Sequence, residues 1–473
     1  MPTPVQFRLA LLLLAGVLGL AACGAPAAPA PAAPAPTSPA VPAQPTPAPT
    51  AVPTAAPTPQ PTPVPGVLFV DVAQPQGAIS PLVYGTNYGP WMGAFLPDVQ
   101  RQVEAGGFSY LRFPGGDYGD QHDIEPQQVD DFVALCRKLG AEPSISLRLR
   151  GGSPERAAAI VRYVNVAKRY AVRYWSIGNE PTLFSDYDVA RFNREWRAIA
   201  QAIRAVDPGI TLVGPDIHQI DAQGAIRDPQ GRFTMREFLE QFLRANGDMV
   251  DVVAVHRYPF PANASGGDPT VDELRANSPE WDAIIPGLRA LVREAAGRDL
   301  PIAVTEVNSN WSATFGGDAT PDSHLGAIWW ADVLARLIRQ RVAIVAQFAL
   351  YAPESAGWGL LRAYSTRPAY YVQLLYRRLG DRQVYAASGD PLVSIVAARR
   401  DDGALTLMLI NRGAGEAALP LRIAGFDPAG AAETWRFDRA HKAAQVDSTA
   451  LGDDARLRLP GESATLLVIA PRQ

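Results

Sequence analysis

Two glutamates lie at the ends of apolar segments, where carboxylates are placed to do acid–base chemistry. Glu180 follows the apolar run 172–177, and Glu306 follows the run 302–305. If both runs are parallel strands of one closed sheet, the two carboxyl groups face each other across a pocket at its rim. One acid and one carboxylate in this arrangement are the groups that hydrolyse a glycosidic bond, as proton donor and nucleophile.

Eight apolar segments of strand length alternate with helical patterns in the middle of the chain. Ser153-Pro154 and the capping box Thr234…Glu237 mark helix starts, and Asp186 precedes another periodic run. Eight strand–helix units predict an α/β fold, a (β/α)8 TIM barrel over residues 67–380, with its active site where the strands end. The expected strands are Leu82–Asn87, Phe108–Phe113, Pro143–Leu149, Val172–Ile177, Thr211–Asp216, Val252–His256, Ile302–Thr305 and Ile344–Leu350.

Side-chain alternation within these strands predicts which face is inside the barrel. In the run 144–149, the polar residues should face the interior and the apolar residues the helices. The same period places two further sets each on one face, Val252, Ala254, His256 and Tyr258 in one strand and Ile302, Val304 and Glu306 in the other.

The pattern changes after an expected helix at Arg367–Leu379. Short strands then follow one another without intervening helices, which predicts a C-terminal antiparallel β-sandwich domain over residues 381–473. Leu68–Val72 is expected to pair into it. The expected strands are Leu392–Ala397, Leu405–Ile410, Leu419–Ile423, Ala432–Phe437, Leu457–Leu459 and Ala464–Ile469.

The N-terminus has the pattern of a targeting segment. The apolar run 9–20 is too short to span a bilayer, and it ends in Leu20-Ala21-Ala22-Cys23, which resembles a bacterial lipobox. The resemblance implies a lipoprotein signal peptide at 1–23, lipidation of Cys23 and an exported protein that is held to a membrane by its lipid anchor, outside the cytoplasm. An ordinary cleavage site before a cysteine is the alternative. Residues 24–66 are rich in Pro, Ala and Thr and are expected to form a disordered linker.

Composition limits the partners and the disulfides that can be expected. The 473 residues carry a formal net charge of −4 without a sustained basic patch, so no nucleic acid partner is expected. Cys136 is the only other cysteine, and it occupies an apolar position of an expected helix. We therefore expect a core residue and no intrachain disulfide.

Four motifs at strand ends carry a family resemblance. They are Arg112-Phe113-Pro114-Gly115-Gly116, Gly178-Asn179-Glu180-Pro181, His256-Arg257-Tyr258-Pro259 and Thr305-Glu306. Together they resemble the retaining glycoside hydrolases of clan A, in particular the β-xylosidase, α-L-arabinofuranosidase, endoglucanase and heparanase/β-glucuronidase families. The resemblance covers about residues 80–473. It implies that Glu180 is the general acid/base, that Glu306 is the nucleophile, that the substrate is an oligo- or polysaccharide, and that no cofactor is needed.

Neighbouring residues are expected to tune this pair. Arg112 and Tyr258 are candidate donors to Glu306, and Asn179 is placed to bind the sugar 2-hydroxyl. His256 should orient the nucleophile or a sugar hydroxyl, unless it is a satisfied core histidine. For a retaining enzyme we expect the carboxyl groups to be about 5–5.5 Å apart.

Other residues near strand ends are candidates for binding substrate. Arg148 and Arg150 at the pocket mouth would bind a carboxylate, which is the basis for a hypothesis of uronate specificity; pairing with Asp117, Asp216 or Glu142 is the alternative. The candidates for holding sugar hydroxyls are Asp117, Tyr118 and Asp123, and those for stacking on sugar faces are Trp91, Trp311 and Trp358, any of which is otherwise a core residue.

Two other functional classes remain to be weighed. A non-catalytic carbohydrate-binding surface lipoprotein could use the same barrel, although such a protein would be expected to have lost one carboxylate. A metal-dependent hydrolase needs clustered ligands, and His122, His218 and His324 lack ligand spacing, so no metal is expected. The chain has no Gly-x-Ser-x-Gly motif for serine hydrolase chemistry.

Overall fold

The computed structural model describes residues 63–93, 95, 97–260, 269–312, 314–363, 365–452 and 456–472. Cys23, the apolar N-terminal run and nearly all of the linker expected at 24–66 lie outside the described residues. Within the described part, helices long and apolar enough to span a bilayer are absent.

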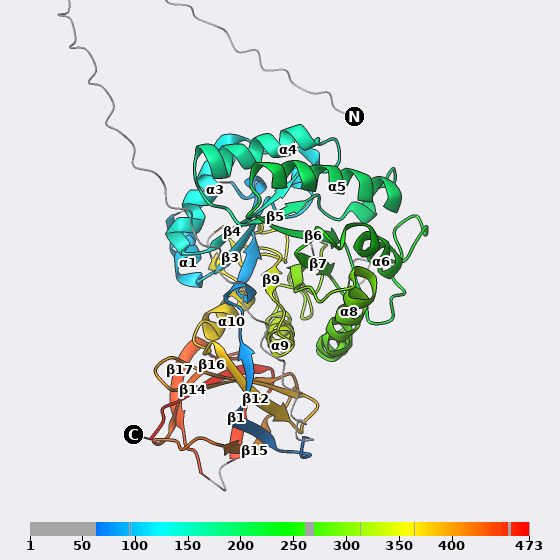
Figure 1. The fold of residues 1–473 in the computed structure, drawn as a ribbon. Coiled ribbons are helices and arrows are strands. Elements are labelled where there is room, and N and C mark those ends of the chain that lie inside the picture. The colour runs from blue at the N-terminus through cyan, green and yellow to red at the C-terminus, as the bar shows by residue number, and fades with distance from the viewer. Residues whose placement is uncertain are drawn as a thin grey trace, which may run out of the picture. The chain divides into compact units, whose positions relative to one another are not determined.

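The described chain contains a closed barrel of eight parallel strands, β2 to β9 in chain order (Figure 1). Every pair of neighbours is parallel, including β2 with β9, which closes the barrel. All eight expected strands are confirmed, with ends that shift by a few residues. The strands are β2 (Gly85–Asn87), β3 (Tyr110–Phe113), β4 (Glu142–Leu147), β5 (Tyr174–Ile177), β6 (Thr211–Ile217), β7 (Val252–Arg257), β8 (Ile302–Val307) and β9 (Ile344–Gln347).

A helix follows each barrel strand. The expected caps of α4 at Ser153 and of α6 at Thr234 are confirmed, whereas α5 is capped by Asp188 and not at Asp186, because the side chain of Asp188 accepts the amide of Arg191. The helices are α1 (Pro97–Gly106), α2 (Tyr118–Gln121), α3 (Pro126–Leu139), α4 (Pro154–Val161) with a π-helical continuation (Arg162–Ala167), α5 (Val189–Val206), α6 (Met235–Asn246), α7 (Val271–Asn277), α8 (Trp281–Ala296), α9 (His324–Arg339) and α10 (Pro368–Tyr376).

Two apolar layers pack against the barrel strands, one outside the barrel and one inside it. A large layer between strands and helices includes Ile145 and Leu147 of β4, and the buried Cys136 of α3 belongs to it, as expected. A smaller layer inside the barrel includes Val252 and Ala254 of β7. The alternation predicted for these residues of β4 and β7 is therefore confirmed.

The C-terminal strands form a nine-stranded, mostly antiparallel sheet, in which β1 (Leu68–Ala78) lies between β12 and β15. The expected pairing of Leu68–Val72 is thus confirmed, and Figure 1 shows β1 in blue beside the later strands. Two strands were not expected from the sequence, β12 and β17. The remaining strands are β12 (Arg382–Ser388), β13 (Val393–Arg399), β14 (Leu405–Asn411), β15 (Ala417–Ala424), β16 (Ala432–Phe437), β17 (Lys442–Thr449), β18 (Arg456–Leu459) and β19 (Ser463–Ile469), and a short hairpin pairs β10 (Leu361–Arg362) with β11 (Ser365–Thr366).

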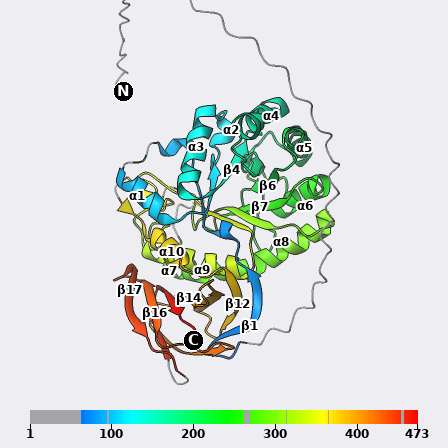
Figure 2. The ribbon, with the colours of Figure 1, turned by 60° about the vertical axis from the view of Figure 1, so that its left-hand side comes forward.

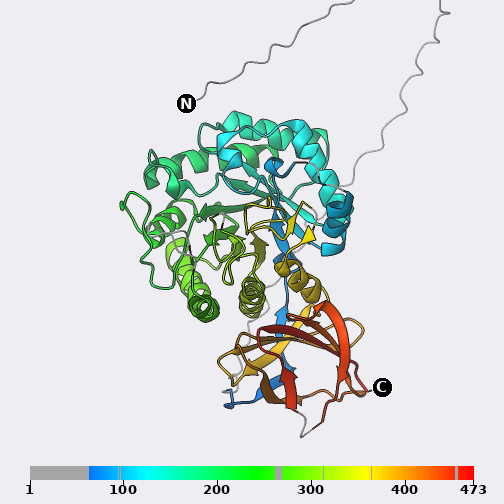
Figure 3. The same ribbon diagram turned by 180° about the vertical axis from the view of Figure 1, so that it is seen from behind.

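Both faces of the central strand β14 are buried. Leu405, Leu407 and Leu409 face a core within the sheet domain, whereas Met408 and Ile410 join the large layer of the barrel. Helix α9 contacts β13 and β14, and α10 contacts β16 and β17 (Figures 2 and 3). The sheet therefore supports the barrel from the side of its last two helices.

Candidate active site

Glu180 is delivered by the tight turn that ends β5. Gly178 has φ +78, and a Cβ there would lie 2.8 Å from the Leu149 side chain, so only glycine fits. Glu180 itself has φ 47 and ψ 50, a left-handed conformation that is uncommon outside glycine. Its amide donates to the carbonyl of Asp216, which is also left-handed at φ 54. Two such residues side by side are typical of a functional site.

Glu306 reaches the same rim because β8 is bulged. Ile302 and Val304 pack on the helix side of the barrel, so simple alternation would send Glu306 outward too. The register with β7 shifts between Val255 and His256, where His256 pairs with Glu306. The prediction that Ile302, Val304 and Glu306 share one face is therefore wrong: the bulge turns Glu306 into the cavity.

Three donors hold the Glu306 carboxylate. Arg112 Nη1 donates to Oε1 over 2.7 Å, the Gly116 amide donates to Oε1 over 3.1 Å, and Tyr258 Oη donates to Oε2 over 2.7 Å. The structure thus places Arg112 and Tyr258 as the sequence predicts and adds the backbone of the loop after β3. Charge-assisted bonds of this kind stabilise a carboxylate anion and fix its direction.

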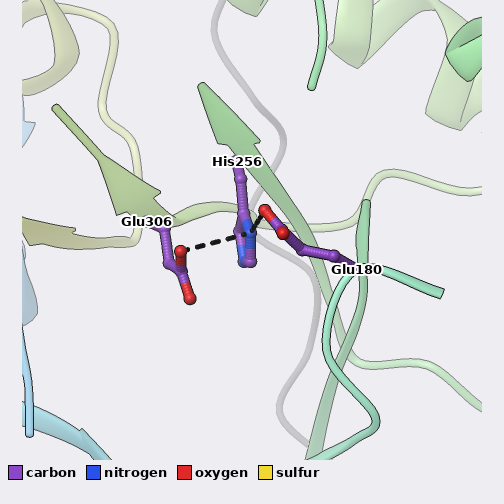
Figure 4. Close-up of side chains that lie close together, drawn as sticks. All are labelled: Glu180, His256 and Glu306. Atoms are coloured by element: carbon purple, nitrogen blue, oxygen red, sulfur yellow. Dashed lines mark hydrogen bonds and ion pairs between the residues drawn. The ribbon is translucent and has the colours of Figure 1, made fainter. Parts of the chain in front are cut away.

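His256 stands between the two glutamates (Figure 4). Its Nδ1 lies 2.8 Å from Glu180 Oε1 and 3.7 Å from Glu306 Oε2, and its Nε2 lies 3.6 Å from Asp216 Oδ1. The imidazole is fully buried. It was expected to orient the nucleophile or a sugar hydroxyl, but its hydrogen bond goes to Glu180.

The glutamates lie close enough to act on one bond. One oxygen of Glu180 and one of Glu306 are within 4.8 Å of each other and of a His256 nitrogen. This bound is shorter than the expected 5–5.5 Å and much shorter than the roughly 6.5–9.5 Å that inverting enzymes use to admit a water between the carboxyl groups.

Their surroundings set the protonation states. Burial raises the pKa of Glu180; the hydrogen bond and charge of His256 lower it, and the Glu306 charge raises it, with a net increase. Burial lowers the pKa of His256, but the Glu306 charge, the nearby Asp216 carboxylate and the hydrogen bond with Glu180 raise it to about 9. Burial raises the pKa of Asp216, but the charges of Arg112 and His256 hold it below its usual range.

These directions balance the buried charges. The charges of Arg112 and His256 oppose those of Asp216 and Glu306, and burial together with the Glu306 charge raises the pKa of Glu180. Of the described acidic residues, histidines and cysteines, Glu180, His256 and Glu306 are the group whose spacing suits a metal ion. A metal needs a neutral imidazole, however, and His256 holds its proton near neutral pH, so the arrangement favours acid–base chemistry.

Further hydrogen bonds orient the residues around the two glutamates. Asn179 Oδ1 accepts a hydrogen bond from Arg112 Nη2 over 2.7 Å. The amide nitrogen of Asn179 therefore points away from Arg112, and Asn179 lines the cavity. Asn87 Oδ1 accepts from Arg112 Nη1 over 3.1 Å. The buried Asp120 carboxylate accepts the amides of Leu149 and Asn179, each over 2.7 Å.

The site opens into a cavity of about 930 Å³. Glu180, Glu306, Asn179 and Tyr258 line it, together with Asp117 and Trp311 among the expected substrate-binding residues. Trp311 is 52% exposed, as a ring offered to a ligand would be.

Other expected substrate-binding residues are not in the cavity lining formed by the described residues. Arg148 pairs with Asp123 at 3.2 Å, and Arg150 pairs with Asp186 at 3.0 Å. Strand β4 ends at Leu147, so alternation no longer aims these arginines inward. The prediction that they stand at the pocket mouth is wrong, and the hypothesis of uronate specificity loses its basis.

The aromatic candidates divide in the same way. Tyr118 stacks on His122 with ring centroids 4.4 Å apart and also contacts Trp91. Trp358 packs behind Phe348, with ring centroids 6.4 Å apart, and Phe348 is the one that lines the cavity. The expectation that Trp358 and Tyr118 face substrate is therefore corrected: within the described residues Trp358 supports Phe348 of the cavity wall, and Tyr118 packs on His122 and Trp91.

Several residues of the site were not predicted as such. Asn87 and Asp216 both end barrel strands, the signal that identified Glu180 and Glu306, and applying it to every strand would have found them. The role of Asp120 depends on a contact between α2 and the ends of β4 and β5, for which the sequence carries no local signal.

Comparison with known proteins agrees with this geometry, although no family model matches the sequence. A probable α-L-arabinofuranosidase C of Aspergillus fumigatus is 25% identical over 179 residues, which cover 28% of this chain and 35% of that protein. A β-xylosidase of Geobacillus stearothermophilus is 25% identical over 265 residues, covering 51% and 47%. The matches thus span less than half the length of these curated relatives.

Solved structures cover more of the chain. An α-L-arabinofuranosidase of Thermotoga maritima has a TM-score of 0.66 at 18% identity, covering 85% of this chain and 99% of that one. CelM2, a bifunctional glucanase-xylanase from a metagenome library, has a TM-score of 0.66 at 19% identity, covering 86% and 100%. The comparisons confirm the resemblance to clan A glycoside hydrolases and show that the chain shares their fold.

Proposed function

We propose that this protein is a retaining glycoside hydrolase that uses Glu180 and Glu306 in a double displacement. The observation that carries the proposal is the pair itself: two carboxyl groups within 4.8 Å at one cavity, one with a raised pKa and one held by three donors. The relatives named α-L-arabinofuranosidase and β-xylosidase make an α-L-arabinofuranoside and a β-xyloside the first substrates to test.

The proposed reaction assigns each group one task. Glu306 attacks the anomeric carbon while Glu180 gives its proton to the leaving oxygen, which forms a glycosyl–enzyme ester and a free alcohol. Glu180, now ionised, takes a proton from water, and that water releases the sugar from Glu306 with its original configuration. Arg112, Tyr258 and the Gly116 amide hold Glu306 in line, and Asn179 is left to contact the sugar.

In this proposal His256 supports Glu180 in both of its protonation states. Its Nδ1–H donates to Glu180 Oε1, so the transferable proton sits on Oε2. When Glu180 loses that proton, the neighbouring imidazolium stabilises the new carboxylate. A residue that stabilises both states of the acid/base through one hydrogen bond suits a group that must act first as acid and then as base.

A screen of aryl glycosides tests the activity. The 4-nitrophenyl α-L-arabinofuranoside, β-xyloside, β-glucoside and β-glucuronide are compared at equal concentration, with Glu306→Ala as the blank and Glu155→Ala, an exposed glutamate on α4, as the matched control. We expect turnover of at least one glycoside by the wild type and Glu155→Ala, and none by Glu306→Ala. Binding of sugar without any turnover would instead favour a non-catalytic carbohydrate-binding protein.

We further propose that the chain is exported and lipidated at Cys23. The support is the lipobox-like sequence before Cys23 and the Pro-rich segment after it. Metabolic labelling with an alkyne fatty acid in a bacterial host should mark the wild type and leave Cys23→Ala unmarked. Equal labelling of both proteins would refute the anchor.

A further inference from the structure

The cavity continues past the catalytic pair on the side of Glu180. At about 930 Å³ it lies at the upper end of the range for small-molecule pockets, roughly 300–1,000 Å³. An acid that protonates the leaving oxygen stands beside the leaving group, whereas the sugar under attack lies against the nucleophile. The wall next to Glu180 therefore shows what kind of alcohol leaves. Its residues are Leu183, His218, Gln219, Asp221, Gln223, Ile226 and Pro229, and the Asp221 carboxylate is occupied by the amides of Ala225 and Ile226.

This wall presents aliphatic surface. Leu183 follows Glu180 by three residues and is 41% exposed, although it lines a cavity. Ile226 and Pro229 come from the loop between β6 and α6 and line the same cavity. Three aliphatic side chains gathered at one open cavity wall mark a surface that gains free energy when an apolar group covers it.

The wall is held in place by hydrogen bonds between its segments. Arg232 donates to the carbonyls of Ser185 and Phe184 over 3.0 and 3.1 Å, which fastens the β6–α6 loop to the segment after Glu180. Arg232 is itself held by Asp228, at 2.7 Å, whose side chain is fully buried. A preformed wall loses little conformational entropy when a ligand binds.

Few polar groups on this wall are free. Gln219 is largely engaged, because Oε1 accepts from the Tyr258 amide and from Arg257, and one of the two N–H groups of Nε2 donates to the Tyr258 carbonyl. The Thr182 hydroxyl accepts from the His218 amide and forms a second hydrogen bond with His218 Nδ1 over 2.7 Å. On the described wall this leaves Nε2 of His218, one N–H of Gln219 and the exposed side chain of Gln223 for a ligand. Burial and the charge of His256 lower its pKa to about 4, so it stays neutral.

We propose that the protein acts on glycosides whose leaving group is an apolar alcohol, alkyl, alicyclic or aryl, in preference to a second sugar. This inference rests on the proposed function and names the substrate class of the same site. A second sugar would bring several hydroxyls to a wall with few free partners, and unpaired hydroxyls oppose binding. An apolar alcohol instead covers Leu183 and Ile226, leaves with the proton of Glu180 and is replaced on the sugar by water.

A chain-length series tests the inference. n-Alkyl glycosides from methyl to octyl, carrying the sugar that the aryl glycosides identify, have leaving alcohols of nearly equal acidity, so kcat/KM reports contact with the wall. We expect kcat/KM to rise about fourfold with each buried methylene. We also expect a disaccharide with the same non-reducing sugar to be a poorer substrate than the octyl glycoside. A flat series, or a better disaccharide, would overturn the inference.

Variants locate the effect. Leu183→Ser and Ile226→Ser should each flatten the series, so that the octyl glycoside loses most of its advantage over the methyl glycoside. Leu392→Ser changes a similarly exposed leucine, 44% exposed, in the sheet domain and should keep the full slope. Equal slopes in all three variants would place the apolar contact elsewhere. Absence of turnover with every aryl glycoside would refute the proposed function itself, whereas turnover with a flat alkyl series refutes only the apolar leaving-group site.

Discussion

At the scale of single residues, the two glutamates differ in what surrounds them. Glu306 receives a guanidinium, a phenol and an amide, while the hydrogen bond that reaches Glu180 within the described residues comes from His256. Burial raises the pKa of Glu180, so the surroundings support the proposed roles of Glu180 as acid and Glu306 as nucleophile. The assignment can be tested one residue at a time.

Glu180→Gln should lower kcat/KM most for substrates whose leaving group needs a proton in order to depart. For a poor leaving group such as an alkyl alcohol we expect kcat/KM to fall by roughly 10²–10⁴, because the amide cannot donate a proton. For a 2,4-dinitrophenyl glycoside the first step needs no acid, and the loss should be far smaller. Steady-state kinetics on both substrates decide the matter, and an equal loss on both would contradict the acid role.

His256→Asn should move the alkaline limb of kcat/KM to higher pH. The hydrogen bond and charge of His256 lower the pKa of Glu180, so their removal lets burial and Glu306 raise it further, and the acid keeps its proton to higher pH. The pH profiles of wild type and variant give the shift. His122→Asn, which changes an exposed ring stacked on Tyr118, is the control with an unchanged profile. A limb that stays in place or moves to lower pH would refute this account of His256.

At the scale of elements, the ends of neighbouring strands are fixed to one another through Asp120. Its buried carboxylate accepts amides from Leu149 and Arg150, after β4, and from Asn179, after β5. Burial raises the pKa of Asp120, and these three hydrogen bonds lower it, with a net increase. One side chain on α2 thus sets where the Asn179–Glu180 pair stands.

Asp120→Asn should impair catalysis, although Asp120 is not among the described residues that line the cavity. The new amide group has an N–H₂ that faces backbone donors, so the β5 turn shifts, and a displacement of about 1 Å at a reacting group can cost roughly 10²-fold in rate. We expect a fall of that order in kcat/KM. Asp123→Asn, a nearby carboxylate paired with Arg148 and Arg156, is the control and should stay within a few-fold of wild type. Equal activity of both variants would show that Asp120 does not position the site.

The sequence predicted elements better than it predicted the direction of individual side chains. All eight barrel strands were expected because each is apolar on at least one face, whereas β17 is polar along most of its length, lies at the sheet edge and gave no alternation to detect. Glu180, Glu306, Arg112 and Tyr258 were expected to meet, and they do. The bulge that turns Glu306 inward and the end of β4 that turns Arg148 outward follow from register and length, which periodicity does not fix.

At the scale of the whole described chain, buried charge joins barrel and sheet. Asp332 of α9 is fully buried, and its Oδ2 lies 2.8 Å from Arg336 Nε and 3.1 Å from Arg412 Nε, the latter from the sheet domain. Arg275 of α7 donates to the Arg412 carbonyl over 2.8 Å and pairs with Glu462 of the sheet domain at the same distance. The last helices of the barrel are therefore tied to the sheet by polar contacts as well as by the shared apolar layer.

Asp332→Ala should destabilise the protein strongly. It leaves the guanidinium group of Arg412 buried without its anion and leaves Arg336 with Asp282 alone, and breaking a buried pair in this way typically costs about 3–5 kcal/mol. Urea unfolding followed by circular dichroism gives the change in the free energy of unfolding. Asp299→Ala, at an exposed pair with Arg293, is the control and should leave stability nearly unchanged. Similar stability of both variants would mean that the Asp332 cluster does not hold the two parts together.

The central claim is that Glu306 forms a covalent bond to the sugar while Glu180 supplies the proton. The most direct test is to incubate the protein with a 2-deoxy-2-fluoro glycosyl fluoride of the active sugar, digest it and locate the added mass by tandem mass spectrometry. The account predicts one sugar per chain, attached to Glu306, with activity lost in step with labelling. A label on Glu180 or on any other residue, or turnover of a cleavable substrate to a product of inverted configuration, would contradict it.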